Sequence, residues 1–278
     1  MLDNLILDIY ITGKCNYKCP YCYGEDFNQP DISLEIFEHA LEFSKKYNCK
    51  LSFTGGEPLL HNNFTQLIQK AKEQSIPMFL RTNGIFLNKY FIELNIFEWI
   101  GISLDGLENI NNILRPNHKN YNFSSIEKFE IPIKAIMKIN KQYPHIKVLL
   151  ATIATGLNSA QLIKMANYLN EKELDIDKWK IYDFTRNNFR SLYASKLYDT
   201  SFEEFTKLKK QLKKTYVGNI VFKENEGNCI IIETNGDLRI NSDIIGNIQE
   251  NKEKLYIKVI NSLKYCEILK NKAKTYNE

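Results

Sequence analysis

Three cysteines that could do metal chemistry lie close together near the start of the chain, in the stretch T-G-K-C-N-Y-K-C-P-Y-C-Y-G-E. Cys15, Cys19 and Cys22 follow the spacing C-x3-C-x2-C, so one loop can turn all three thiols toward one ion or cluster. Thiolates are soft ligands that select zinc, copper(I) or an iron–sulfur cluster. A structural zinc site takes a fourth Cys or His, and His39 and His61 stand well downstream. A cubane cluster held by three cysteines keeps one iron without a protein ligand, where a small molecule can bind.

A second feature is the run Gly55-Gly56-Glu57-Pro58, which follows a short apolar segment. Two glycines let a backbone come close to a ligand. A carboxylate beside them can accept a charge-assisted hydrogen bond from an ammonium group. The same run also suits a turn that caps the next helix.

The elements that must position these residues alternate along the chain. Apolar runs predict strands at 5–11, 50–54, 77–82, 99–104, 146–154 and 179–184. Helical periodicity predicts helices at 33–47, 63–74, 86–96, 123–142 and 158–171. Ser33 suits the N-cap of the first helix, whose apolar face holds Leu34, Phe37 and Leu41. Residues 107–122 read as irregular.

Alternating strands and helices indicate an α/β fold with parallel strands and right-handed crossovers. Six such units are too few to close an eight-stranded barrel, so we expect a partial (βα)6 TIM-type barrel over residues 1–200. Residues 201–278 are expected to form a small C-terminal α+β cap. Its expected parts are a helix at 202–216, a hairpin of 219–222 with 229–233, an Asn-Gly turn at 234–237 and a helix at 250–273.

In such folds the chemistry lies at the carboxyl ends of the strands. The cysteines, G-G-E-P, T-N-G and S-L-D-G each follow a predicted strand. The cysteine spacing, with Tyr21 before the third cysteine, and the G-G-E-P run together resemble the radical S-adenosylmethionine (radical SAM) superfamily.

The resemblance implies one [4Fe–4S] cluster on Cys15, Cys19 and Cys22, with SAM bound at the open iron. In relatives G-G-E-P holds the methionyl amine of SAM, and the matching serine and arginine contact its ribose and carboxylate. Carried onto this chain, the implied SAM contacts are Tyr21, Gly55, Gly56, Glu57, Pro58, Thr82, Asn83, Ser103, Arg115 and Ile153. For Tyr21 and Ile153 a core position is the alternative, for Arg115 a surface ion pair, and for T-N-G a plain turn.

The implied reaction is reductive cleavage of SAM to a 5′-deoxyadenosyl radical, which abstracts a hydrogen from a substrate. A reducing partner such as flavodoxin or ferredoxin would supply the electron. The substrate-side candidates are Asp105, Lys180, Tyr182 and Asp183, which stand on or at the ends of the fourth and sixth strands. Lys180 also suits a solvated lysine, and Tyr182 a core aromatic. The catalytic residues themselves stay unassigned.

S-L-D-G followed by Arg115-Pro116 is similar to members that modify peptides, whose SPASM or twitch domains bind extra clusters. Only Cys229 and Cys266 stand in the C-terminal segment, so we expect a degenerate twitch-like cap and a single cluster. These two and Cys49 are interpreted as structural thiols. The favoured substrate is therefore a peptide or protein, although a small molecule stays open.

Viperin-like nucleotide-modifying enzymes are the second resemblance, through Lys50 and the Trp179-Lys180 pair. Leu149 and Ala151 depart from it, because viperin-like proteins carry polar phosphate-binding residues there. From another class, a non-catalytic zinc or iron–sulfur binding module stays open.

The chain of 278 residues is 44% hydrophobic and 25% charged, with a net charge of +4. Many lysines share helix-like segments with glutamates, which is typical of solvated faces and not of a nucleic-acid surface. We see no signal peptide and no apolar run long enough for a membrane span, so we expect neither a membrane nor a nucleic-acid partner. Six cysteines in this context predict reduced thiols and a cytoplasmic protein.

Overall fold

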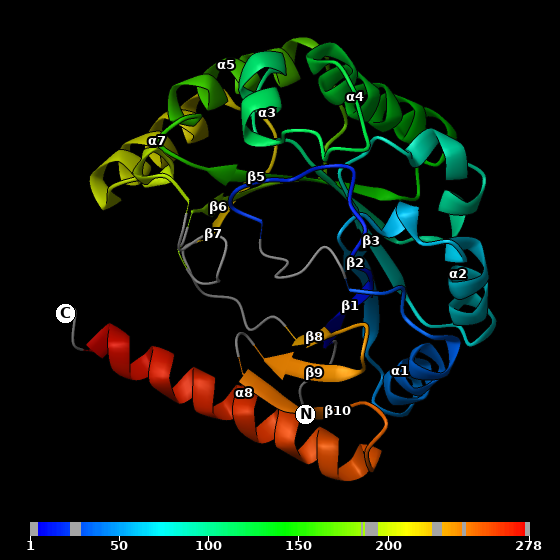
Figure 1. Cartoon of the computed structure of the whole chain (residues 1–278). Coiled ribbons are helices and arrows are strands. Elements are labelled where there is room, and N and C mark those ends of the chain that lie inside the picture. The colour runs from blue at the N-terminus through cyan, green and yellow to red at the C-terminus, as the bar shows by residue number, and fades with distance from the viewer. Residues whose placement is uncertain are drawn as a thin grey trace. The chain divides into compact units, whose positions relative to one another are not determined.

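A computed structural model of the chain (Figure 1) describes residues 5–22, 29–184, 186, 194–223, 230–240 and 243–275, with the side chains of the last helix described as far as residue 264. The chain divides into two compact units. The first comprises Met1–Lys14, Asn28–Met78 and Gly227–Glu278, and the second comprises Cys15–Phe27 and Phe79–Glu226. Cys229 and the side chain of Cys266 lie outside the described residues.

The first unit is built around strand β1 (Ile6–Thr12), which pairs in parallel with β2 (Lys50–Gly55) and β8 (Ile230–Ile232). Leu7, Ile9 and Ile11 of β1 are fully buried, as strand alternation predicts. Two antiparallel strands, β9 (Asp237–Ile240) and β10 (Asp243–Asn247), extend the sheet beyond β8.

The helical elements of the first unit are α1 (Leu34–Lys46), η1 (Pro58–Leu60), α2 (Phe64–Glu73) and α8 (Lys252–Thr275). Ser33 caps α1 as predicted, because its hydroxyl accepts from the N–H of Ile36 at 3.2 Å. Of the predicted apolar face, Phe37 and Leu41 are fully buried, whereas Leu34 in the first turn of α1 is 39% exposed. Tyr47, which ends α1, stacks on Tyr256 of α8 with 3.8 Å between ring centroids.

The second unit contains a half-sheet of parallel strands, with helices α4, α5 and α7 along one face of it (Figure 1). The strands are β3 (Met78–Thr82), β4 (Trp99–Ser103), β5 (Lys147–Ala154), β6 (Lys178–Asp183) and β7 (Ile220–Lys223). The helices are α3 (Glu108–Leu114), α4 (Ser125–Gln142), α5 (Ser159–Glu171) and α7 (Phe202–Thr215), and η4 is a single 3-10 turn (Lys196–Tyr198). Trp179 and Ile181 on β6 are fully buried and alternate with half-buried Lys180 and Tyr182.

Three sequence predictions of local structure differ from the observed elements. Residues 86–96 form two 3-10 turns, η2 (Leu87–Tyr90) and η3 (Glu93–Ile96), where a helix was expected. Residues 107–122 contain α3 where irregular chain was expected. The expected hairpin of 219–222 with 229–233 is wrong: β7 pairs in parallel with β6, and β8 pairs in parallel with β1.

The Asn-Gly turn is confirmed as the connection of the antiparallel strands β8 and β9, with Gly236 at a φ of +87°. Strand β10 was not expected from the sequence. Within the described helices, none combines the length and the apolar character that a membrane crossing requires.

Candidate active site

The turn after β2 depends on its two glycines. Gly55 has a φ of +136°, which side-chain-bearing residues rarely adopt, and a Cβ there would also collide with the carbonyl oxygen of Thr12. A Cβ on Gly56 would lie 2.6 Å from the carbonyl oxygen of Gly13. The N–H of Gly56 instead donates to the Thr12 carbonyl at 2.7 Å. Only glycine allows this turn to pack directly on the backbone at residues 12–14.

Glu57 follows these glycines with a side chain only 1% exposed. Its N–H donates to the carbonyl of Lys14 at 2.7 Å, and its Oε1 accepts from the N–H of Leu59 at 3.2 Å. Glu57 therefore caps η1, which begins at Pro58, as the turn alternative predicts. Its predicted role toward the methionyl amine of SAM stays a prediction.

Asp31, which the sequence reading did not single out, anchors the segment that leads into the cysteines. Its carboxylate accepts from the Thr12 hydroxyl at 2.6 Å and from Lys14 Nζ at 2.8 Å. Burial alone would raise the pKa of Asp31, but these two hydrogen bonds outweigh it and lower the pKa. Asp31 is thus an ionised anchor for Thr12 and Lys14, and Lys14 directly precedes the first cysteine.

The three cysteines of the second unit are partly exposed thiols. The N–H of Tyr17 donates to the Cys15 sulfur at 3.4 Å, and the N–H of Cys22 donates to the Cys19 carbonyl at 3.2 Å. Among the described residues, no three His, Cys, Asp or Glu side chains gather closely enough to bind one metal ion. Cluster cysteines bind different irons of one cubane, and three thiols on one loop are the donor set that a [4Fe–4S] cluster with one open iron requires.

The loop that carries the cysteines is held from two sides within the second unit. The N–H of Lys18 donates to the Pro116 carbonyl at 2.9 Å, and the N–H of His118 donates to the Asn16 carbonyl at 2.8 Å. The Asn16 side chain accepts from Nδ2 of Asn83 at 2.7 Å. The predicted T-N-G residue Asn83 therefore contacts the cysteine loop, where it helps fix the loop's position.

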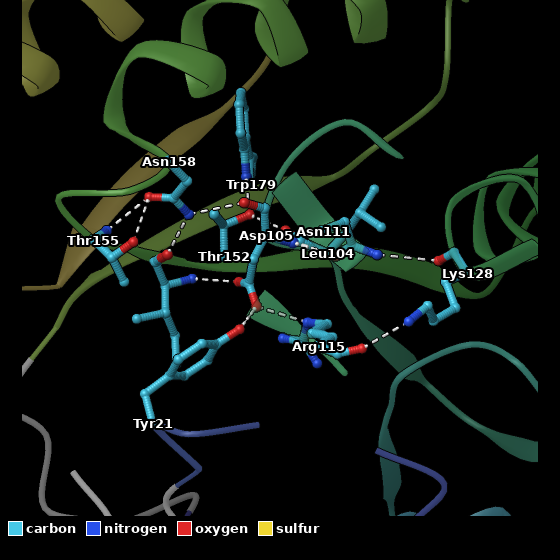
Figure 2. Close-up of polar contacts among 11 residues, drawn as sticks. Tyr21, Leu104, Asp105, Asn111, Arg115, Lys128, Thr152, Thr155, Asn158 and Trp179 are labelled. Atoms are coloured by element: carbon cyan, nitrogen blue, oxygen red, sulfur yellow. Dashed lines mark hydrogen bonds and ion pairs between the residues drawn. The ribbon is translucent and has the colours of Figure 1, made fainter. Parts of the chain in front are cut away.

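A buried carboxylate, Asp105, joins three other predicted site residues (Figure 2). It is fully buried, and the Tyr21 hydroxyl donates to its Oδ2 at 2.5 Å. Arg115 Nε forms an ion pair with the same oxygen at 2.6 Å. The other oxygen, Oδ1, accepts from the N–H of Ile153 at 2.7 Å. Asp105 thus connects the cysteine loop to β5 and to Arg115 at the C-cap of α3. These contacts hold Tyr21 and Arg115 in fixed positions.

Asn158, just before α5, binds the backbone of Asp105 and of Ile153 (Figure 2). Its Nδ2 donates to the carbonyls of Asp105 and Ile153, both at 2.8 Å, and its Oδ1 accepts from the N–H of Thr155 at 2.7 Å. The sequence reading missed Asn158. The available signal was an asparagine next to a predicted helix start, which is common in helix caps.

Charge and burial act together on the side chains around Cys19. Burial raises the pKa of the Cys19 thiol to about 12, and the nearby Arg115 works against this rise. Burial, followed by the negative charge of Asp105, raises the pKa of Tyr21, so its phenol stays protonated. Burial works against the charge of Arg115, but Asp105 raises its pKa above the ordinary value. A metal-bound thiol is deprotonated outright, and a guanidinium beside Cys19 favours the thiolate.

An apolar patch adjoins Cys19 in the second unit. Its buried members are Tyr21, Leu114, Phe184, Ala194 and Tyr198, and the partly buried residues packed against it include Cys19 and Ile153. The rings of Tyr21 and Tyr198 lie 5.8 Å apart. Ile153 is thus placed where an apolar base could pack beside the cysteine loop, while the adenine contact itself stays a prediction.

The register of the half-sheet places the remaining predicted residues in rows. Ser103 on β4 pairs with Ala151 on β5, which pairs with Lys180 on β6. Ile153 pairs with Tyr182 one row further on. Paired residues of adjacent strands face the same side, so these side chains share one face. Asp183 pairs with Ala154 and belongs to the opposite alternation, and the Thr82 hydroxyl accepts from the N–H of Gly84 at 3.0 Å.

Comparison with known proteins decides the family. The family model described as the radical SAM superfamily matches residues 9–169, which is more than half of the chain. The chain belongs to the radical SAM superfamily. The predicted [4Fe–4S] cluster and SAM are the cofactors of that superfamily, so the predictions of family and cofactors are confirmed.

Individual sequence relatives act on nucleotides by name. An S-adenosylmethionine-dependent nucleotide dehydratase from Selenomonas ruminantium is 29% identical over 63% of this chain and 64% of its own length. A GTP 3′,8-cyclase from Staphylococcus epidermidis is 28% identical over 66% of this chain and 55% of its own. The chain therefore spans less than two thirds of the length of these radical SAM relatives.

Solved structures with the same fold include peptide-bound radical SAM proteins. SuiB of Streptococcus suis, bound to its precursor peptide SuiA, superposes with a TM-score of 0.72 at 17% identity, over 91% of this chain and 64% of that one. The protein anSMEcpe with bound AdoMet gives a TM-score of 0.71 at 19% identity, over 91% and 80%. At these identities the likeness concerns the fold, and it confirms the predicted α/β class with a partial TIM-type barrel.

Proposed function

We propose that this radical SAM chain cleaves SAM reductively at a single cluster on Cys15, Cys19 and Cys22 and modifies a peptide or protein. The observation that carries the proposal is the set of contacts around Asp105, which joins the cysteine loop through Tyr21 to Arg115 and to the backbone of Ile153. A cluster and SAM supply an adenosyl radical when bound. The protein must hold both cofactors rigidly and keep water out.

The chain's own residues divide this work. Asp105 holds Tyr21 and Arg115 at fixed positions beside Cys19. In the proposed complex Arg115 keeps donors for a carboxylate, since Asp105 pairs with its Nε and a guanidinium carries five N–H groups. Gly55 and Gly56 bring the turn of Glu57 onto the backbone that precedes the cysteines. These residues bind and orient, and the hydrogen that is abstracted belongs to the substrate.

The character of β5 favours a peptide over a triphosphate. Leu149, Ala151 and Ile153 alternate with fully buried residues and are half-buried on one face of the strand. A triphosphate needs several cationic or hydrogen-bonding side chains, and this stretch of β5 offers none of them. An apolar and backbone-rich surface suits an extended peptide better.

A nucleotide substrate is the second candidate, and two lysines favour it. Lys180 on β6 shares the face just described, and Lys223 on β7 pairs with Tyr182 in the next row. Lys180 Nζ lies 4.9 Å from the centre of the Tyr182 ring. A cation can pair with a phosphate and an aromatic ring can stack on a base, and the nucleotide-acting sequence relatives fit this alternative.

The first experiment is anaerobic reconstitution with iron and sulfide, followed by reaction with SAM and dithionite. The wild-type chain should hold about four irons per chain and form 5′-deoxyadenosine. Cys15→Ala should lose most of the iron and all of this activity. Cys49→Ala is the matched control, because Cys49 is a buried thiol of the first unit. This variant should keep both its iron content and its 5′-deoxyadenosine formation. Undiminished 5′-deoxyadenosine formation by Cys15→Ala would refute the ligand assignment.

The same assay identifies the substrate class by isotope transfer. Deuterated ribonucleoside triphosphates are compared with a deuterated synthetic peptide that copies any short reading frame encoded beside this protein. Transfer of deuterium into 5′-deoxyadenosine from the peptide supports peptide modification. Transfer of deuterium from a nucleotide would refute peptide modification and support the nucleotide substrate.

A further inference from the structure

A buried lysine stands beside the cysteine loop, and none of the carboxylates that the structure describes pairs with it. Lys128 lies in the second turn of α4 and is 2% exposed. Its backbone carbonyl accepts from Nδ2 of Asn111, which fixes this part of α4 against α3. Lysine is almost never fully buried unless it is paired, so the position requires a physical explanation.

The ammonium of Lys128 has two recorded contacts, both in the second unit. Nζ donates to the carbonyl oxygen of Arg115 at 3.2 Å (Figure 2) and lies 5.7 Å from the centre of the Tyr17 ring. In the part of the chain that the structure describes, no carboxylate pairs with it. A carbonyl and a ring face offset only part of the cost of burying a full charge.

The missing counter-charge is indicated by where the ammonium of Lys128 lies. Nζ faces the ring of Tyr17, a residue between Cys15 and Cys19 in the sequence whose N–H donates to the Cys15 sulfur at 3.4 Å. The charge of Cys19 also raises the pKa of Lys128, which burial lowers. The Arg115 guanidinium also acts on Cys19, where its charge lowers the pKa of the thiol, but that guanidinium already forms an ion pair with Asp105 at 2.6 Å. Lys128 is therefore a buried cation near Cys19 whose charge no neighbouring carboxylate offsets within the described residues.

We propose that Lys128 is a positioning residue that serves as the counter-charge of the cluster and raises its reduction potential. The inference rests on the proposed assignment of the cluster to Cys15, Cys19 and Cys22. A cluster gains one negative charge when it is reduced, and its potential depends on the charges around it. A fixed cation in a water-poor site stabilises the reduced form more than the oxidised form.

The test is an anaerobic redox titration of the reconstituted protein, followed by the electron paramagnetic resonance signal of the reduced cluster. Lys128→Met keeps the length of the side chain and removes its charge. It should make reduction about tenfold less favourable, which is a downward shift of about 59 mV for one electron. Lys128→Arg should keep the wild-type potential.

Lys134→Met is the matched control, because Lys134 lies on the same helix but is exposed and paired with Glu130. It should leave the potential unchanged. A fully loaded Lys128→Met variant with the wild-type potential would overturn the inference, even if its melting temperature fell, because lost packing alone does not move a potential.

Lys128→Gln covers the case in which Lys128→Met takes up no cluster, since an amide keeps a donor for the Arg115 carbonyl. A lowered potential in Lys128→Gln supports the inference, and an unchanged one overturns it. If both neutral variants fold but stay empty while Lys128→Arg loads normally, a positive charge at this position is required to hold the cluster, which supports Lys128 as its counter-charge. Failure of Lys128→Arg to load the cluster as well would show that Lys128 serves packing, and it would overturn the inference.

Failure of the proposed function would look different. Absence of iron from the reconstituted wild-type chain would refute the assignment of the cluster to the three cysteines. A nucleotide substrate in place of a peptide would leave all the outcomes for Lys128 unchanged.

Discussion

Asp105 shows how one buried side chain can define a site. A buried ion pair with Arg115 is stable only when its remaining hydrogen-bonding capacity is used. The Tyr21 hydroxyl and the N–H of Ile153 satisfy that requirement at 2.5 and 2.7 Å. The sequence reading proposed Asp105 as a substrate-side residue, whereas its contacts support a role in holding the residues that would touch SAM.

Removing the Asp105 carboxylate should therefore be costly. Asp105→Ala leaves Arg115 as a buried charge without its partner and leaves the Tyr21 hydroxyl without its acceptor. We expect a loss of about 3–5 kcal/mol in the free energy of unfolding, measured by urea denaturation. The double variant Asp105→Ala, Arg115→Leu should recover much of this loss, because it removes the orphaned charge. No recovery in the double variant would show that the ion pair is not the main reason for burying Asp105.

Individual residues divide clearly into those that the sequence could predict and those it could not. Cys15, Cys19 and Cys22 were predictable because their spacing along the chain already places them on one loop. The pairing of Asp105 with Arg115 was not, because it depends on how α3 turns the chain back between them. Lys128 was not predicted either, since a lysine in an amphipathic helix normally lies on the solvated face.

Elements were predictable wherever a local pattern agreed with burial. β1, α1 and α4 follow their apolar periodicity and side-chain caps closely. α3 was missed because its sequence, E-N-I-N-N-I-L, is rich in asparagine, a weak helix former. The partners of β7 and β8 were mistaken because pairing with β6 and β1 is set by the tertiary fold. Proximity in sequence favoured a hairpin that the sheet does not use.

His61, between η1 and α2, should make the stability of the fold depend on pH. His61 is 3% exposed, and its Nδ1 accepts from the N–H of Asn63 at 3.0 Å, next to the start of α2. Burial lowers the pKa of His61, while Asp31 raises it and Lys14 lowers it. The folded pKa lies below the unfolded value, so the fold binds the proton less well than the unfolded chain does.

Stability should therefore be complete above the unfolded pKa of about 6.5 and should decline as the pH falls from there toward the folded pKa. His61→Asn keeps an acceptor for the Asn63 N–H but cannot titrate. We expect the free energy of unfolding of the wild type to fall more steeply than that of His61→Asn between pH 7.5 and 5.5. Parallel curves for the two proteins would contradict this account of His61.

At the scale of the whole molecule, the two units differ in what they contribute. The cysteines, Asp105, Arg115 and Lys128 all belong to the second unit, whereas the glycine turn and Glu57 belong to the first. A ligand that binds only the folded state stabilises the part of the protein that forms its site. A cluster bound to the three cysteines would also offset the buried cations beside Cys19.

Removal of the cluster should consequently weaken the second unit more than the first. We expect apo protein, prepared with a chelator under oxidising conditions and then reduced again, to melt at a lower temperature than the reconstituted protein. Hydrogen exchange followed by mass spectrometry should show faster exchange around β4, α3 and β5, because these elements hold Asp105 and its partners. Exchange in β1 and β2 should change less, since the pairing of β1 with β2 and with β8 involves no cysteine ligand. Equal loss of protection in both sets of strands would mean that the cluster stabilises the chain as a single cooperative unit. That result would contradict the prediction that its effect is larger in the second unit.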